Sequence, residues 1–166
     1  MKQYLQDRAR EAISYGYDVA KAVLINCAIM PPAVYATAYL LQVYGVVNFD
    51  ISLGDLFRIP YGSLLMTFVM VGFAEEGLFR YFLQDRLFEK FLGINKYVAL
   101  VLAAVLFGAA HLSNGFGVPY SIPQSVGAGL SGLYFGYLYR KRGLCFAALT
   151  HGFYDILVTL IYVVLR

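Results

Sequence analysis

The stretch Val71-Gly-Phe-Ala-Glu-Glu-Gly-Leu-Phe-Arg-Tyr-Phe-Leu83 places two adjacent carboxylates and an arginine inside a run of apolar residues. Charge at the centre of such a run costs several kcal/mol unless it is paired or hydrated. Glu76 and Arg80 are four residues apart, so they share one helix face and can pair. Glu75 is rotated by about 100° and can face something else. The stretch predicts a buried helix whose charges have a structural or a chemical reason to be there.

Composition indicates the solvent around that helix. Of the 166 residues, 60% are hydrophobic and 14% are charged, whereas soluble domains have roughly 25% charged residues. We therefore expect one compact, all-α integral membrane protein without a soluble domain. The net charge is +3, and the basic residues form no long patch of the kind that binds nucleic acid. Cys27 and Cys145 lie in apolar runs without CxxC spacing, so we interpret them as packing residues.

The apolar runs predict a polytopic transmembrane helical bundle of about five spans, preceded by an N-terminal interfacial helix. That helix covers residues 1–12, and the spans cover about 19–47, 61–83, 97–112, 122–139 and 144–165. Pro31-Pro32 predict a kink or break in the first span. In the fourth span Ala128, Gly132 and Gly136 recur at every fourth position, which permits close helix approach. We divide the chain into residues 1–60, with the interfacial helix and first span, and residues 61–166, with the remaining bundle.

Basic residues suggest the orientation. If the N-terminus is cytoplasmic and five spans alternate, most lysines and arginines, including Arg140-Lys141-Arg142, fall on the cytoplasmic side. This is the positive-inside bias. The expected location is the cell membrane, multi-pass, with the N-terminus in the cytoplasm.

Ionisable side chains occur on three of the expected spans. Beside the glutamates of the second span, His111 lies on the third, and His151 and Asp155 lie four residues apart on the fifth. Each alone could be a buried ion pair or hydrogen bond. Three helices that each bring an acid or an imidazole favour a common site, because an apolar bundle would avoid that cost. On straight spans Glu75 would lie about 14 Å from the cytoplasmic end, His151 about 10 Å and His111 about 21 Å. Tilt, a longer second span or a third helix that starts later would be needed to bring them level.

These groups suit hydrolysis. A carboxylate beside an imidazole can take a proton from water, and a second imidazole can stabilise the oxyanion formed at an amide carbonyl. Glu75, His111 and His151 would equally suit a divalent metal such as zinc with an open position for water. No HExxH is present, so spacing gives zinc no specific support. No Ser–His–Asp or Cys–His arrangement is readable.

Three motifs carry a family resemblance. Glu75-Glu-Gly-Leu-Phe-Arg80 matches EExxxR, Phe107-Gly-Ala-Ala-His111 matches FxxxH, and His151-Gly-Phe-Tyr-Asp155 matches HxxxN/D. In that order, over about residues 62–164, they resemble the CPBP family, also called Abi, of intramembrane CAAX-protease and bacteriocin-processing enzymes.

The resemblance implies an α-helical membrane endopeptidase with six catalytic-site residues. Glu75 with His111 would activate water, His151 with Asp155 would line the oxyanion side, and Glu76 with Arg80 would support the arrangement. Asp155 stands where the prenyl-protein enzymes have asparagine. An ionised aspartate cannot donate to an oxyanion, so Asp155 would be protonated, orient His151 or bind a metal. The chain is shorter than the eight-span eukaryotic members, so a prenylated substrate is not implied. The resemblance leaves metal and glutamate dependence open.

We therefore expect an endopeptidase that cleaves a peptide or protein substrate in the membrane, in peptide maturation or bacteriocin immunity for example. Helix phase permits either Glu75 or Glu76 as the base, and the motif favours Glu75. A proton- or ion-coupled transporter is the alternative, since the same acids and histidines could form a proton relay. A third reading is a membrane partner that keeps the fold without chemistry. Substrate identity and oligomeric state are not encoded in any pattern that we can read.

Overall fold

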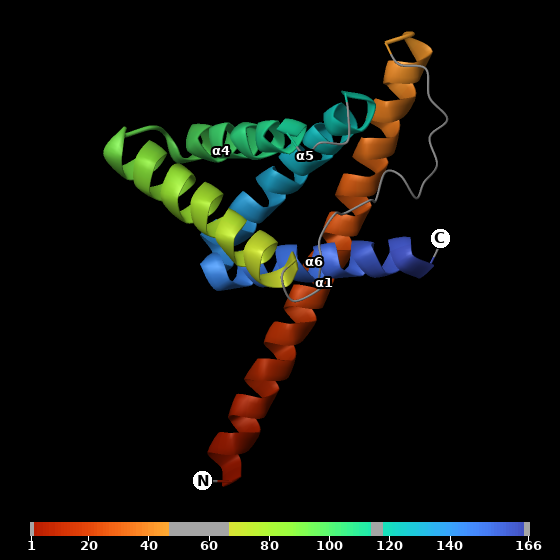
Figure 1. Ribbon diagram of the computed structural model, residues 1–166. Coiled ribbons are helices and arrows are strands. Elements are labelled where there is room, and N and C mark those ends of the chain that lie inside the picture. The colour runs from red at the N-terminus through yellow and green to blue at the C-terminus, as the bar shows by residue number, and fades with distance from the viewer. Residues whose placement is uncertain (1, 47–66, 114–117, 165–166) are drawn as a thin grey trace.

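The computed structural model describes residues 2–46, 67–113 and 118–164. Its elements are the α-helices α1 (Lys2–Val43), α4 (Lys96–Ala110), α5 (Val118–Arg142) and α6 (Leu144–Val164), the π-helical segments η1 (Thr67–Glu75) and η2 (Gly77–Phe91), and the 3₁₀ turn η3 (His111–Ser113) (Figure 1). These described ranges contain no strand. The all-α prediction is confirmed.

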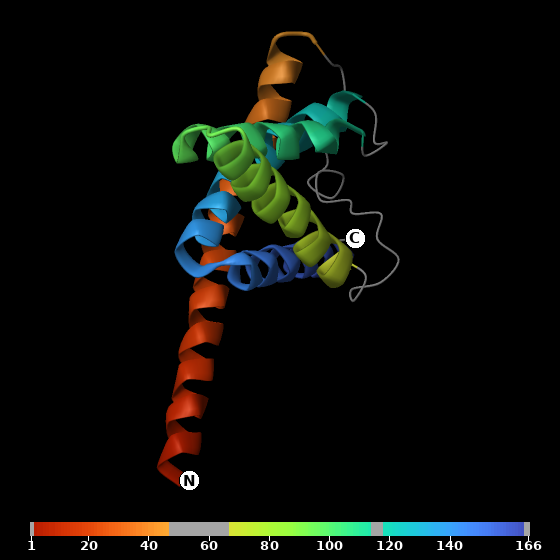
Figure 2. The ribbon, with the colours of Figure 1, turned by 90° about the vertical axis from the view of Figure 1, so that its left-hand side faces the viewer.

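Helix α1 replaces two predicted elements. The expected interfacial helix and first span form one continuous helix, and Pro31 and Pro32 lie inside it without breaking it. Of the expected kink or break, the break is therefore wrong, and the kink stays a prediction. A break among apolar residues would leave backbone groups unpaired, so continuing the helix costs less. The N-terminal end of α1 projects beyond the other helices (Figures 1 and 2).

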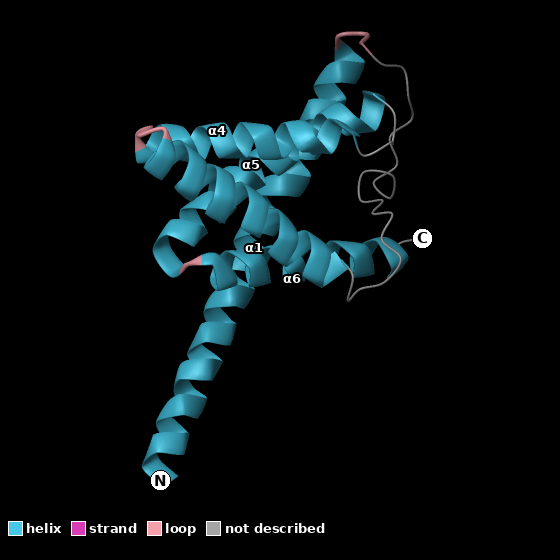
Figure 3. Ribbon diagram, turned by 60° about the vertical axis from the view of Figure 1, so that its left-hand side comes forward, coloured by secondary structure: helices cyan, strands magenta, loops and turns pink. Residues whose placement is uncertain are grey.

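The rest of the bundle is built on α5, which packs against both α1 and α4 (Figure 3). Small residues set the spacing: a Cβ added to Gly108 of α4 would lie 2.6 Å from the Ser125 backbone oxygen of α5. On the other side, Phe135 of α5 belongs to an apolar core cluster with Val23 of α1 and Phe146 of α6. One helix therefore joins α1 to the helices that carry the charged motifs.

The second helical stretch ends later than expected. We placed its end at Leu83, but η2 continues to Phe91. In a π-helix the backbone pairs residues five apart, and the side chains follow: Lys90 Nζ donates to Asp85 Oδ2 at 2.8 Å. The segment expected to be a charged connection is thus helical, and its Gln84 is fully buried.

At one end of the bundle, two arginines of α5 bind residues of three other elements. Arg140 near the end of α5 donates to Glu89 of η2 and, at 2.6 Å, to the Lys96 backbone oxygen at the start of α4. Arg142 donates to Asp18 of α1 at 2.7 Å. We call this region the basic end. The prediction that these basic segments share one side of the membrane is consistent with it.

Three helical stretches of the described residues are long and apolar enough to cross a membrane: Gln3–Val43, Lys96–Ser113 and Leu144–Ile161. The outward face of α4 exposes Val98, Val101 and Val105, as suits contact with lipid. The second expected span begins in residues 61–66, which lie outside the described residues. The fold is a helical membrane bundle, and the count of five spans stays a prediction.

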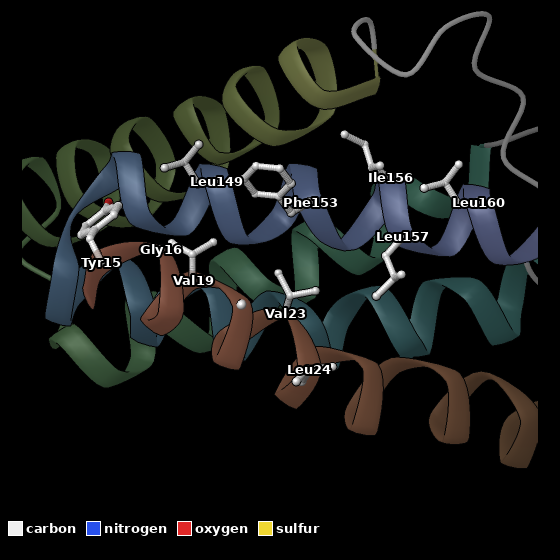
Figure 4. A pocket seen from close by; sticks show the side chains of 11 residues that line it. Tyr15, Gly16, Val19, Val23, Leu24, Leu149, Phe153, Ile156, Leu157 and Leu160 are labelled. Carbon is white, nitrogen blue, oxygen red and sulfur yellow. The ribbon is translucent and has the colours of Figure 1, made fainter. Parts of the chain in front are cut away.

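An apolar groove of about 570 Å³ lies between α1 and α6 (Figure 4). We call it the α1–α6 groove. Its lining consists of Tyr15, Gly16, Val19, Ala20, Val23, Leu24, Leu149, Phe153, Ile156, Leu157 and Leu160.

Candidate active site

The two adjacent glutamates lie where η1 meets η2, and their environments differ. Glu76 and Arg80 are fully buried, and Arg80 Nε–H donates to Glu76 Oε2 at 3.0 Å. The predicted pairing of residues four apart is present. Glu75 is half-buried, and its enclosed Oε2 has no hydrogen-bond partner in the described part of the chain. The arginine therefore holds one carboxylate and leaves the other unrestrained.

Glycine brings the second imidazole to Glu76. A Cβ on Gly72 of η1 would lie 2.7 Å from the Ala148 backbone oxygen and 3.0 Å from the Gly152 Cα of α6. The two backbones can approach this closely because neither glycine has a side chain. One turn after Gly72, Glu76 Oε1 accepts a hydrogen bond from His151 Nδ1–H at 3.0 Å. The contact between two glycines thus sets the distance between acid and imidazole.

Asp155 completes this side of the site. It lies one turn after His151 on α6, is buried, and has its Oδ2 3.4 Å from His151 Nε2. Both ring nitrogens of His151 therefore face carboxylate oxygens. The separation to Asp155 exceeds that of a good hydrogen bond, so this contact is looser than the one to Glu76.

His111 joins the group through Phe107. His111 caps α4, and its Nδ1–H donates to the Phe107 backbone oxygen at 2.8 Å. The ring centroid of Phe107 is 4.8 Å from that of His111 and 5.6 Å from that of His151. Because the helices cross at an angle rather than run as straight parallel spans (Figure 1), the difference in depth expected from the sequence does not separate the two imidazoles.

Phe107 has a second role beside the charges. The guanidinium carbon of Arg80 lies 4.8 Å from the centre of its ring, in a cation–π contact. Phe79 packs against the ring edge-to-face at 5.1 Å. Such contacts stabilise a cation that has been taken out of water. We call Glu75, Glu76, Arg80, His111, His151 and Asp155 the acid–imidazole centre; the structure brings all six predicted site residues to it.

Two residues of this region were missed in the sequence. Phe135 of α5 stacks on His151, with centroids 4.5 Å apart and the planes inclined by 24°. Gln84 is fully buried one turn beyond Arg80. The signal for Gln84 was its spacing of four from Arg80, which continues the Glu76–Arg80 face. Phe135 had no signal, since aromatic residues are common throughout the chain.

The fit of a metal can be tested on the side chains present. Among the residues that the structure describes, no three His, Cys, Asp or Glu side chains form a group that could hold an ion. His111 donates through Nδ1 to backbone, which leaves Nε2 available as a ligand atom, whereas both nitrogens of His151 face carboxylates. The set of Glu75, His111 and His151 considered for zinc is therefore not arranged as a ligand set, and we derive no step through a metal.

Fold and site together define a helical membrane protein with a buried carboxylate–imidazole centre, built from η1, η2, α4 and α6. Residues 58–157, well over half of the chain, match the family described as Type II CAAX prenyl endopeptidase Rce1-like. The chain belongs to this family, and the resemblance to the CPBP enzymes is confirmed. Neither a curated protein nor a solved structure gives a significant match. At family level the protein is a CAAX-protease-like intramembrane endopeptidase that acts on a peptide substrate in the bilayer.

Proposed function

We propose that this endopeptidase cleaves its substrate with water activated by Glu75 and His111. The observation that carries the proposal is the division of labour between the two glutamates. Both oxygens of Glu76 are engaged, one by Arg80 and one by His151. Glu75 has an oxygen without a partner among the described residues. A general base needs a free lone pair within reach of the water that it deprotonates, and Glu75 meets that requirement better than Glu76.

His111 assists from the other side. Its Nδ1 carries the hydrogen, because a carbonyl oxygen can only accept. Nε2 is then the ring atom that exchanges a proton with water or with the leaving amine. Glu75 takes one proton from water, and the resulting hydroxide attacks the amide carbonyl to form the new C–O bond. The C–N bond then breaks, and the amine leaves with that proton, passed on from Glu75 directly or through His111 Nε2.

His151 and Asp155 serve the side on which the oxyanion develops. Asp155 cannot donate when ionised, so the donor is His151 Nε2–H, which Asp155 holds only at 3.4 Å. Glu76 accepts from Nδ1–H and fixes the ring. A hydrogen bond from a pre-oriented donor to a developing oxyanion lowers the barrier without reorganisation. Glu76 and Arg80 therefore act as positioning residues.

The proposed orientation places the basic end and the N-terminus in the cytoplasm, in line with the positive-inside bias. The substrate is a peptide or protein segment that enters from the membrane.

The test is cleavage of a membrane-tethered peptide library in proteoliposomes by the wild type, Glu75→Gln and His111→Ala, each with and without a chelator. We expect cleavage to fall by about 10²–10⁴-fold in Glu75→Gln. Glu11→Gln is the matched control, because Glu11 is exposed on the projecting end of α1, beside Arg8. If Glu75→Gln cleaves as well as the wild type, the proposal fails and proton flux becomes the next assay. Loss of cleavage with chelator would overturn the metal-free mechanism.

A further inference from the structure

Buried polar atoms without partners form a row on η2. Gln84 is fully buried, and within the described residues neither atom of its side-chain amide has a hydrogen-bond partner. The same holds for Nη1 and Nη2 of Arg80. Buried groups of this kind are rarely left unsatisfied, since each costs on the order of 1–3 kcal/mol. Their occurrence one turn apart on one helix face calls for a function.

Glycines of α5 leave room for these groups. A Cβ added to Gly132 would lie 3.3 Å from Arg80 Nη2, and one added to Gly136 would lie 2.7 Å from Gln84 Oε1. Gly132 and Gly136 are one turn apart, as are Arg80 and Gln84. A side chain at either position would press on the guanidinium or the amide, so the two glycines let these polar groups lie directly against the backbone of α5.

The row connects the acid–imidazole centre with a pocket at the basic end. At its inner end Arg80 is bonded to Glu76, and Glu76 to His151. At its outer end, on the next turn of both helices, lies a pocket of about 390 Å³ at the basic end. The pocket is lined by Asp85, Glu89, Tyr139, Arg140, Gly143 and Leu144. Arg140 Nε is also enclosed and unpartnered in the described part of the chain.

We propose that water reaches the acid–imidazole centre from the basic end, along the polar face of η2 formed by Arg80 and Gln84. We call Arg80, Gln84, Gly132 and Gly136 the water path. Water is the ligand that fits, because it accepts from the guanidinium N–H groups and both donates to and accepts from an amide. Hydrolysis consumes one water per bond cleaved, so a site among apolar helices requires such a supply. The need for water rests on the proposed function, whereas the row of buried polar atoms does not.

The first test does not depend on catalysis. In a background with Cys27→Ala and Cys145→Ala, Gln84→Cys is treated in detergent and in sealed vesicles with an anionic, water-soluble methanethiosulfonate. The matched control is Ala147→Cys, which is equally buried but lies in the apolar core cluster. Because thiolates form in hydrated surroundings and not in apolar ones, we expect Gln84→Cys to react at least about tenfold faster. Equal, slow modification of both folded variants would overturn the path.

The second test adds a methyl group on α5 beside the water path, so that less space remains for water. Gly136→Ala brings a methyl group against the flexible end of Gln84, whereas Gly129→Ala on the same helix makes only ordinary contacts at 3.7 and 3.9 Å. We expect Gly136→Ala to lower kcat by about tenfold with KM for the peptide unchanged, because about 1.4 kcal/mol is added to the chemical step alone. Gly129→Ala should keep the wild-type kcat. If Gly136→Ala and Gly129→Ala have equal kcat values, the proposed water path is wrong. If the wild type itself cleaves no peptide, the proposed function is wrong instead.

Discussion

Helix α6 borders two very different spaces. Leu149, Phe153 and Leu157 face the α1–α6 groove, while His151 and Asp155 face the acid–imidazole centre. The groove has a volume of about 570 Å³, but Tyr15 is the sole ionisable residue among the described residues that line it. The centre brings together three carboxylates, two imidazoles and a guanidinium. In a membrane protein, buried ionisable side chains therefore indicate the site of chemistry better than the volume of a pocket does.

The largest effect should come from removing the cation of the centre. Arg80→Met removes the buried guanidinium that pairs with Glu76 Oε2, which should cost about 3–5 kcal/mol of stability. Thermal denaturation in detergent would measure it. Arg86→Met, on the exposed face of η2, is the control and should change stability by less than about 1 kcal/mol. If the double variant Arg80→Met with Glu76→Gln is no more stable than Arg80→Met, the loss is not one of charge pairing.

Next in size is the difference between the two glutamates. Glu75→Gln should lower kcat by about 10²–10⁴-fold and leave the melting temperature near that of the wild type, since Glu75 Oε2 gives up no bond. Glu76→Gln should lower both, because two buried hydrogen bonds depend on its carboxylate. Parallel measurements of kcat and melting temperature check this. If Glu75→Gln were destabilised but kept a normal kcat, Glu75 would be the positioning residue and Glu76 the candidate base.

A smaller effect is expected on the far side of His151. Phe135→Leu removes the stacked ring that holds the imidazole, and such ring contacts contribute about 0.5–1.5 kcal/mol. We expect kcat to fall by up to about tenfold with KM unchanged. Phe153→Leu, on the groove side of the same helix α6 as His151, is the control for losing an aromatic ring. Equal kcat values for the two variants would show that the stacking does not orient His151.

The smallest effect should be in the groove itself. Leu160→Ala removes a partly exposed side chain that lines it, so stability should change by no more than about 0.5 kcal/mol and cleavage should stay at the wild-type rate. Initial rates with the tethered peptide would check this. A strong loss of cleavage would mean that the groove takes part in catalysis and that the contrast between the two spaces is wrong.

Much of this arrangement was predictable because its signals are local. The charges of Glu76 and Arg80 are four residues apart in an apolar run, and so are His151 and Asp155, so helix geometry alone pairs them. The all-α membrane fold follows from composition. The continuity of α1 through Pro31 and Pro32 was not predictable, because it depends on what a break would expose. The burial of Gln84 had a signal in its spacing of four from Arg80, but a glutamine beside Asp85 and Arg86 is interpreted as part of a polar connection until η2 is known to continue past Leu83.

The approach of η1 to α6 has a consequence for how substitutions in this protein would be interpreted. Gly72 and Gly152 have no side chain to offer a substrate, yet a single methyl group at either would collide with the opposite helix or with Phe68. The carboxylate and imidazole that meet one turn away would then separate. A mutational screen scored by activity would therefore rank these two glycines with the reacting residues. The activity would be lost because the two helices are pushed apart, although neither glycine takes part in the reaction.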